Sequence, residues 1–312
     1  MKAAREAPIV ETPAAFREAV ARLDWRPSRP ATARGALLVS PVGFRLDEQS
    51  ASDNLYMATD GEVSEARALE EHRRLAEALA GTLPVMVLPG DPATPDAVFP
   101  NNVFATVPGR LIVGRMRHPV RRLEAPRADI RERLGPGLGY ETIDLSARED
   151  LVAELTGPLV VDRARGIGYV GLSERCDRAG AEAMHEAFDL ALSFVFELAP
   201  GEYHTNVVMA VLAGRALVVH EGSFRDPEVP AAIAELYPDR TLRLSDEEKA
   251  AFVGNCIALS ENEVWMSERA ERALRPESRA ALGSWGFAVR SVPLEEIEKS
   301  GGSLRCCVAE IF

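Results

Sequence analysis

A repeat of about fifty residues is the feature that most constrains how this chain can fold. Two β-rich runs joined by a turn containing Gly, Asn or Arg recur along the sequence at 101–116, 156–172, 205–220 and 255–269. A fifth pattern is split, because one half lies at 305–312 and the other at 34–44. Matching positions of successive repeats lie 49 to 54 residues apart, at Asn102, Thr156, Asn206, Asn255 and Cys306.

Helical patterns separate these hairpins and are expected at 65–79, 179–196, 230–236 and 268–282. A ββα-type unit of this size cannot bury its apolar face alone, so its neighbours must cover it. We therefore predict an α/β fold, a five-bladed α/β propeller with pseudo-fivefold ββα-type repeats. The first and last strands would close the ring and leave no exposed edge. A generic α/β domain with accidental spacing is the alternative.

The repeats run through most of the chain, so we expect a single catalytic domain over 1–312, with 1–33 as an N-terminal extension. A chain of 312 residues can bury a sizeable core without staples. The four cysteines form neither a CxxC pair nor a zinc-site spacing, so we expect no disulfide framework and no metal site. The sequence implies no cofactor.

Charge and hydropathy limit the partners and the location of the protein. The formal net charge of −12 and the pI of about 5.1 argue against nucleic acid and anionic membranes. The N-terminus, MKAAREAPIVETPAAF, lacks the apolar core of a signal peptide, and no apolar run reaches the ~20 residues of a membrane span. We expect a cytoplasmic protein that binds a small-molecule amino acid, and a homo-oligomer stays open.

Three chemically active residues share one phase of the repeat. Glu154 lies two residues before Thr156, His204 lies two before Asn206, and Cys306 aligns with the starts of both hairpins. Equivalent phases of a ring converge on its axis, so a carboxylate, an imidazole and a thiol would meet there. This set suits nucleophilic cysteine catalysis. Taken singly, each residue has a structural interpretation, such as a small buried cysteine.

Motifs along most of the chain resemble the guanidino-group modifying superfamily, the penteins or amidinotransferases. The motifs are SPVGFRLDEQSASDN at 40–54, TPDAVFPNNVFAT at 94–106, VAELTG at 152–157, GLSERCD at 171–177, GEYHTNVVMAV at 201–211, FVGN at 252–255 and GGSLRCCVAE at 301–310. The sequence is most similar to the citrulline-utilising hydrolases, and is related to dimethylarginine dimethylaminohydrolase and arginine deiminase. That superfamily has a five-bladed α/β propeller, in agreement with the repeat.

The resemblance assigns roles to individual residues. It implies that Cys306 is the nucleophile, His204 the acid/base group and Glu154 the catalytic carboxylate. Asp96 matches a substrate-binding aspartate, and Arg175 matches a basic residue that holds the substrate carboxylate. Either Arg121 or Arg122 is expected to assist.

Amides stand at three places where relatives have acids, and at two of these places, Asn102 and Asn206, the acid of the relatives binds a guanidinium. Asn101 and Asn102 stand where dimethylarginine hydrolases have two acids, and Asn206 stands where deiminases have an aspartate. A guanidinium is a permanent cation that offers only donors, and it favours carboxylates. A neutral ureido group has a carbonyl as well as N–H groups, so amides suit it better. The alternative interpretation is that Asn102 and Asn206 are turn residues.

These observations predict a cysteine hydrolase that acts on the C–N bond of a ureido or guanidino amino acid. The favoured reaction converts citrulline to ornithine, carbon dioxide and ammonia through a covalent intermediate on Cys306. Dimethylarginine dimethylaminohydrolase or arginine deiminase activity is the first alternative, and amidino transfer is the second. Outside enzymes, the alternative is a non-catalytic binding module of the same architecture. The polar segment 44–56 is expected to act as a lid.

Overall fold

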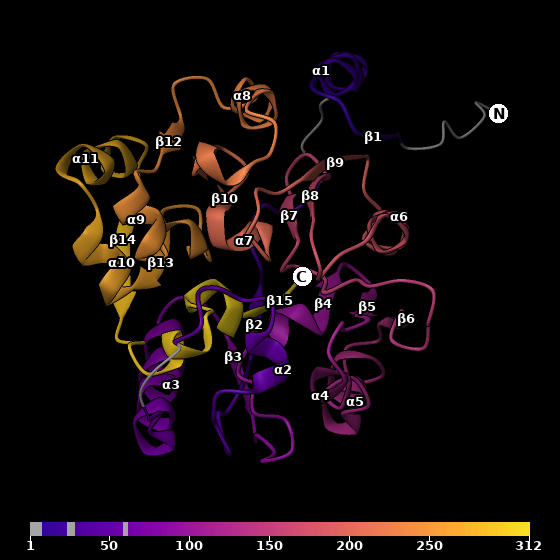
Figure 1. The fold of residues 1–312 in the computed structure, drawn as a ribbon, viewed down its shortest axis with the longest axis vertical. Coiled ribbons are helices and arrows are strands. Elements are labelled where there is room, and N and C mark those ends of the chain that lie inside the picture. The colour runs from indigo at the N-terminus through magenta and orange to yellow at the C-terminus, as the bar shows by residue number, and fades with distance from the viewer. Residues whose placement is uncertain (1–7, 24–28, 59–61) are drawn as a thin grey trace.

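Five small sheets make up the fold of the residues that the computed structural model describes, 8–23, 29–58 and 62–312. Figure 1 shows these sheets arranged about the middle of the molecule, with helices toward the outside. The architecture is the mixed α/β fold that alternating hairpins and helical patterns predict.

Three of the sheets repeat one pattern of strands. Two consecutive strands form an antiparallel hairpin, and a third returns after helical segments or a helix to lie parallel to the second. The strands are β4 Phe104–Val107, β5 Arg110–Val113 and β6 Glu141–Asp144; β7 Leu159–Asp162, β8 Ile167–Leu172 and β9 Leu192–Glu197; β10 Met209–Leu212, β11 Ala216–Val219 and β12 Thr241–Arg243. The third strand corrects the expected ββα-type unit to ββαβ. Short, mostly exposed strands such as β6 lack the periodicity that would identify them.

The fourth hairpin of the sequence is only partly present. β13 Glu263–Ser267 pairs in parallel with β14 Ala288–Val292. The other arm of the hairpin predicted at 255–269 is reduced to a single bridge between Ile257 and Trp265. The prediction is therefore confirmed for the second arm alone.

The split repeat is joined in one sheet. β15 Ala309–Ile311 pairs antiparallel with β2 Gly35–Val39, with Ala309 opposite Leu37. β3 Val85–Leu88 lies parallel to β2 on its other side. Segments separated by about 270 residues thus form one sheet, as the sequence predicts.

The helix predicted at 65–79 is confirmed as α3 Glu65–Leu79. The Ser64 side chain caps its N-terminus by accepting a hydrogen bond from the Arg67 backbone N–H at 3.3 Å. Leu75 and Leu79 on its inner face are fully buried.

The helix predicted at 179–196 is wrong in its second half. α6 Arg178–Ala187 ends at Phe188, and Asp189 adopts a left-handed φ of 51° that an α-helix cannot contain. The apolar residues that follow belong to the buried strand β9. A continuous apolar run has no period that separates a buried strand from a buried helix.

The helix predicted at 268–282 is two helices, α10 Glu268–Ala273 and α11 Pro276–Ser284. Pro276 disfavours helical geometry at the preceding Arg275, whose ψ is 152°. The helix predicted at 230–236 is α8 Glu228–Ala234. Shorter helices complete the described chain: α2 Glu48–Ala51, α4 Pro119–Arg122, α5 Ala128–Leu134, α7 Thr205–Val208 and α9 Asp246–Ala250.

The described part of the segment 1–33 is integrated into the fold. β1 Ile9–Val10 adds a parallel strand to the edge of β9. The helix α1 Pro13–Arg22 places the fully buried Phe16 against the Phe194 ring, stacked at 4.5 Å between centroids. These residues therefore cover a sheet, which an appended extension would not do.

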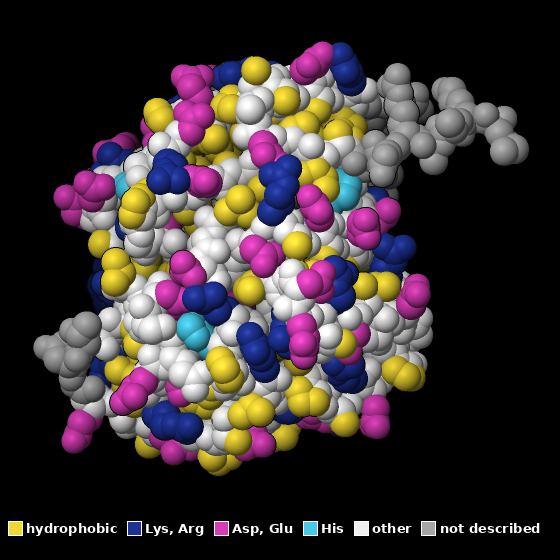
Figure 2. Space-filling view, turned by 45° about the vertical axis from the view of Figure 1, so that its right-hand side comes forward, with side chains coloured by type: hydrophobic (Ala, Val, Ile, Leu, Met, Phe, Trp, Pro, Cys, Tyr) yellow, Lys and Arg dark blue, Asp and Glu magenta, His cyan; other side chains and the backbone are white. Residues whose placement is uncertain are grey.

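Basic and acidic side chains are interspersed over the face of the molecule in Figure 2. Many form surface ion pairs, such as Arg73 with Glu77 and Arg131 with Asp144. None of the helices in the described ranges is both long enough and apolar enough to span a membrane. Cytoplasmic location and homo-oligomerisation stay predictions.

Candidate active site

Cys306 lies in a short 3-10 turn, Leu304–Cys307, that follows two glycines. Gly301 has a left-handed φ of 78°, and a Cβ on Gly302 would lie 3.2 Å from the Cβ of Cys306. The glycines thus let the backbone turn close to the sulfur. The cysteine is 2% exposed, and burial raises the pKa of its thiol, although a hydrogen bond from Asn255 Nδ2 at 3.3 Å opposes that shift.

A cavity reaches this cysteine. Its walls come from segments far apart in the sequence, as expected of residues at matching phases of a repeat. Six of the ten predicted site residues are among those that line it: Ser50, Asn54, Asp96, Phe99, Asn102, Arg121, Arg175, Tyr203, His204, Ser300, Gly302 and Cys306.

His204 precedes α7 and is held in place by its neighbours on both sides. Its Nε2 lies 3.0 Å from Glu154 Oε2, and its Nδ1 lies 3.2 Å from Asn102 Nδ2. These contacts suit the tautomer with the proton on Nε2, which donates to the carboxylate while Nδ1 accepts from the amide. A Cβ at Gly157 would lie 2.6 to 2.7 Å from the imidazole ring, so only glycine leaves room for the ring there.

Glu154 is fully buried behind His204 and is kept ionised by its surroundings. Burial alone would raise the pKa of this carboxyl group, but the charge of Arg175 and the hydrogen bond with His204 hold it well below its usual range. Burial lowers the pKa of His204, and Glu154 opposes that effect. The resting site therefore holds an ionised carboxylate, a neutral imidazole and a protonated thiol at neutral pH.

Arg175 ties the cavity to the segment predicted as a lid. Its guanidinium contacts Glu154 at 3.3 Å, donates to Asp53 at 3.0 Å and reaches the backbone oxygen of Ser50 at 3.0 Å. Ser50 and Asn54 line the cavity, so part of the segment 44–56 forms its wall. Opening of that segment stays a prediction.

Asp96 faces the cavity between two hydroxyl groups. Its carboxylate accepts hydrogen bonds from Ser50 Oγ at 2.5 Å and from Ser300 Oγ at 3.1 Å. Arg121 lines the same cavity, donates to the backbone oxygen of Asp96 at 3.2 Å and pairs with the buried Glu124 at 2.8 Å. Both residues are thus in reach of a ligand, and Arg121 also fixes the loop that carries Asp96.

Arg122 does not line the cavity. Its guanidinium donates to the backbone oxygens of Met116 at 2.9 Å and Arg117 at 2.8 Å. Of the two arginines that the sequence offered, Arg121 is the one that reaches the cavity.

The three predicted amides divide into two kinds. Asn102 lines the cavity, and its Oδ1 is buried with no hydrogen-bond partner among the described residues. Asn101 and Asn206 do not line it, and both donate from Nδ2 to the backbone oxygen of Thr156, at 3.3 and 2.8 Å. The amides of Asn101 and Asn206 thus join neighbouring repeats, and contact of these two residues with substrate stays a prediction.

Asn255 is a site residue that the sequence analysis did not select. Its Nδ2 donates to the backbone oxygen of Asn206 at 2.8 Å and to Cys306 Sγ at 3.3 Å. Its repeat phase, shared with Asn206 and Cys306, was the available signal. Tyr203, whose hydroxyl donates to the backbone oxygen of Gly301, was missed as well, because a tyrosine beside a histidine has no distinctive pattern.

Metal ligands do not gather in the described part of the chain, where no group of three or more His, Cys, Asp or Glu side chains could hold an ion. The arginines at the cavity are paired with carboxylates, whereas Asp96 accepts hydrogen bonds from two serine hydroxyl groups. A thiol and a neutral imidazole line this cavity together with hydrogen-bond donors and acceptors, an arrangement that can support nucleophilic attack followed by proton transfer.

Comparison with known proteins places the chain in a family. The model of the eukaryotic N,N dimethylarginine dimethylhydrolase family matches residues 40–312. The uncharacterized protein YkgA of Bacillus subtilis is 23% identical over 262 residues, covering 83% of this chain and 82% of that protein. The bifunctional arginine dihydrolase/ornithine cyclodeaminase AgrE of Nostoc is 22% identical over 80% of this chain, which spans only 34% of AgrE.

Solved structures share the fold. The N-terminal domain of the cyanobacterial arginine dihydrolase ArgZ, a cysteine-to-serine variant bound to substrate, superposes with a TM-score of 0.78 at 20% identity, covering 89% of this chain and 97% of that domain. A dimethylarginine dimethylaminohydrolase variant, as an adduct with S-methyl-L-thiocitrulline, gives 0.70 at 21% identity, covering 89% of this chain and 100% of the other. The chain belongs to the N,N dimethylarginine dimethylhydrolase family of guanidino-group hydrolases, within the pentein/amidinotransferase superfamily.

Proposed function

We propose that this protein is a cysteine hydrolase that converts citrulline to ornithine, carbon dioxide and ammonia. One observation carries the proposal. Cys306 and His204 line the same buried cavity, and His204 is hydrogen-bonded at 3.0 Å to the ionised Glu154. A nucleophile, an acid/base group and an orienting carboxylate are the parts that a covalent hydrolysis needs.

The chemistry proceeds in two stages on these residues. His204 takes the proton of the Cys306 thiol, and the sulfur attacks the carbon of the ureido group. A C–N bond breaks, and His204 gives that proton to the departing ornithine amine. A water molecule, deprotonated by His204, then attacks the carbon bound to sulfur, the C–S bond breaks, and the proton returns to the Cys306 thiolate. The carbamate released decomposes to carbon dioxide and ammonia. One water is consumed per citrulline. Glu154 orients the imidazole and stabilises its cationic form.

The preference for citrulline now rests on Asn102, the one predicted amide in the cavity. Its unpartnered Oδ1 can accept an N–H of the substrate, and a neutral amide leaves no carboxylate without a countercharge when a neutral ureido group binds. A guanidino group would also supply that N–H. The amide therefore favours a ureido group through charge.

Arginine is the second candidate substrate. The observation that favours it is the Asp96 carboxylate, which lines the cavity and suits a cationic group. The relatives ArgZ and AgrE are arginine dihydrolases, and AgrE has been seen in complex with L-arginine. Complete hydrolysis of arginine would pass through the ureido stage and yield the same ornithine.

The test is to incubate the purified protein with citrulline, arginine, dimethylarginine and agmatine, and to measure ornithine, citrulline and ammonia. Cys306→Ala should abolish turnover, and Cys307→Ala should retain it because that neighbour is packed in the apolar core. Equal activity in Cys306→Ala would contradict the mechanism. Turnover of none of the four substrates would contradict the substrate assignment and favour a binding module, whereas turnover that requires an added amine would identify amidino transfer.

Asn102→Asp is expected to shift the ratio of kcat/KM for arginine over citrulline upward by at least about tenfold, since charge-assisted hydrogen bonds are roughly twice as strong as neutral ones. Competition assays with both substrates measure the ratio directly. Asn101→Asp is the matched control, because Asn101 does not line the cavity. An unchanged ratio in Asn102→Asp would show that this amide does not select the substrate.

We also propose that the five sheets close into the predicted propeller and act as one catalytic domain. The pairing of β15 with β2 supports closure. The hydrogen bonds from Asn101, Asn206 and Asn255 support it further, because each joins one repeat to the next.

A further inference from the structure

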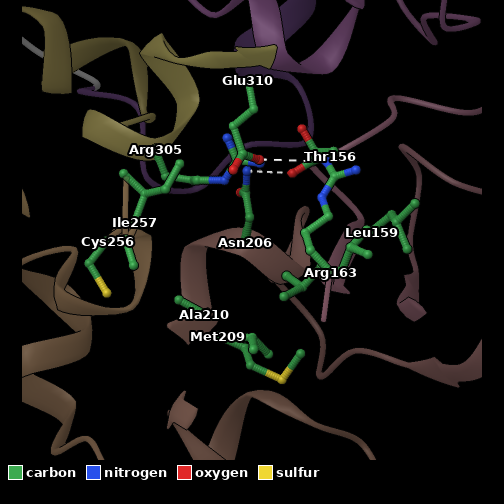
Figure 3. Close-up of a pocket in the computed structure, with 14 residues that line it drawn as sticks. Thr156, Leu159, Arg163, Asn206, Met209, Ala210, Cys256, Ile257, Arg305 and Glu310 are labelled. Atoms are coloured by element: carbon green, nitrogen blue, oxygen red, sulfur yellow. Dashed lines mark hydrogen bonds and ion pairs between the residues drawn. The ribbon is translucent and has the colours of Figure 1, made fainter. Parts of the chain in front are cut away.

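A second cavity lies on the other side of the amides that flank Cys306. Residues from several separate segments line it. It shares no lining residue with the cavity at Cys306, but Asn206 and Thr156 lie in its wall. Figure 3 shows Arg305, Asn206 and Arg163 converging on Glu310 from separate parts of the chain.

Three charged side chains line this second cavity, and their charges do not sum to zero. Arg305 Nη2 donates to Glu310 Oε2 at 2.9 Å, whereas Arg163 Nη2 lies 3.6 Å from the same oxygen. The side chains of Arg163, Arg305 and Glu310 are only 10 to 12% exposed. Two guanidinium groups share one carboxylate, so the cavity has a local charge of about +1.

Of the two arginines, Arg163 makes the longer polar contacts. Nη1 donates to the backbone oxygen of Thr106 at 3.2 Å, and the guanidinium lies 4.1 Å from the centroid of the Phe312 ring. Burial lowers the pKa of Arg163 to about 10, which shows poor hydration while leaving the group charged at neutral pH. A guanidinium offers five N–H donors, so most of its capacity remains for a ligand.

The rest of the wall is largely apolar. It includes Met209, Ala210, Ile257, Leu159 and Val160. Figure 3 places Met209 and Ala210 away from the charged groups, so that the cavity has a cationic end and an apolar end. A ligand that fits both ends has an anionic head and a short hydrocarbon body.

We propose that this second cavity binds a small monocarboxylate with an aliphatic chain, whose head group lies between Arg163 and Arg305. A monoanion balances the single excess positive charge, and its two oxygens match the fork of a guanidinium. The site is separate from the cavity at Cys306, because the two cavities share no lining residue.

Calorimetric titration of the full protein with hexanoate tests the site, with 1-hexanol as the uncharged comparison. One hexanoate should bind per chain, at least tenfold more tightly than hexanol. Arg163→Gln should weaken hexanoate binding at least tenfold. Arg225→Gln removes the same charge at an exposed position paired with Glu197, and should leave the affinity unchanged.

Glu310→Gln is expected to change the affinity for hexanoate in the opposite direction. It removes the competing carboxylate and should tighten hexanoate binding severalfold, a gain that misfolding cannot produce. The proposal is overturned if hexanoate shows no saturable binding, if hexanol binds equally well, or if Arg163→Gln folds and keeps the affinity. Should Arg163→Gln fail to fold, the absence of tightening in Glu310→Gln overturns it.

Discussion

At the scale of single residues, the position of the His204 imidazole depends on the absence of a side chain at Gly157. Gly157 lies directly against the ring, at a distance where a Cβ would overlap it. The ring cannot retreat without losing its contact with Glu154. Space at position 157 is therefore as much a part of the site as the groups that carry protons.

Gly157→Ala is expected to lower kcat by about 100-fold or more, because displacement of a catalytic group by ~1 Å costs that much. Steady-state kinetics on the substrate that turns over measures the effect. Gly283→Ala is the matched control, since a Cβ there meets nothing within 4 Å and alanine stabilises a helix relative to glycine. Equal activity in the two variants would contradict the tight placement of His204.

The thiol of Cys306 should react slowly at neutral pH and faster as the pH rises. Burial raises its pKa, so the thiolate, which is the reactive form, is scarce at neutral pH and accumulates only in alkaline solution. Iodoacetamide labelling between pH 6 and 10, followed by mass spectrometry in a Cys307→Ser background, gives the profile. A rate that reaches its plateau below neutral pH would show a stable resting thiolate instead.

The catalytic residues could be selected from the sequence, but the substrate contacts only in part. Glu154, His204 and Cys306 occupy equivalent positions in their repeats, and such positions come together when the repeats pack side by side. The direction of an amide within a short turn does not follow from phase, so Asn101 and Asn206 could not be told from Asn102. Which of two adjacent arginines faces inward was equally undetermined.

At the scale of elements, the outer helices and edge strands show what periodicity can and cannot predict. The amphipathic helix α3 was predicted to the residue, because one clear stripe faces the core. The buried strand β9 was taken for helix, since all its neighbours are apolar. The strand β1 has only two residues, and its pairing depends on the tertiary position of β9.

Phe16 is the residue that attaches α1 to the body of the protein. Phe16→Ala is expected to lower the free energy of unfolding by about 3–5 kcal/mol, because it leaves a cavity against Phe194 and Tyr169. Activity per folded molecule should be unchanged, since none of the three rings lines the cavity at Cys306. Urea unfolding measures the loss, and Glu18→Ala on the exposed face of α1 should change stability little.

At the scale of the whole molecule, the sheet that joins β2 and β15 makes distant segments depend on one another. Leu37 lies at its centre, fully buried and opposite Ala309. If the sheets form one domain, loss of this contact should weaken all of them together. Separate folding units would respond separately.

Leu37→Ala is expected to cost about 2–5 kcal/mol of unfolding free energy. Far-UV circular dichroism and tryptophan fluorescence should shift by the same amount, as a single cooperative transition requires. Val87→Ala in β3, a half-exposed position of the same sheet, should leave both midpoints nearly unchanged. Two transitions that separate in Leu37→Ala would contradict the single domain.

The pairing of β2 with β15 also means that one strand of a sheet is synthesised long before its partner. At translation rates of about 5–20 residues per second, β2 leaves the ribosome roughly 15 to 55 seconds before β15 is made. During that interval its edge is uncovered and available to other chains, so chaperone protection matters most for β2. Cys306 is translated only three residues before β15 begins. The reactive sulfur therefore arrives together with the strand that completes its sheet.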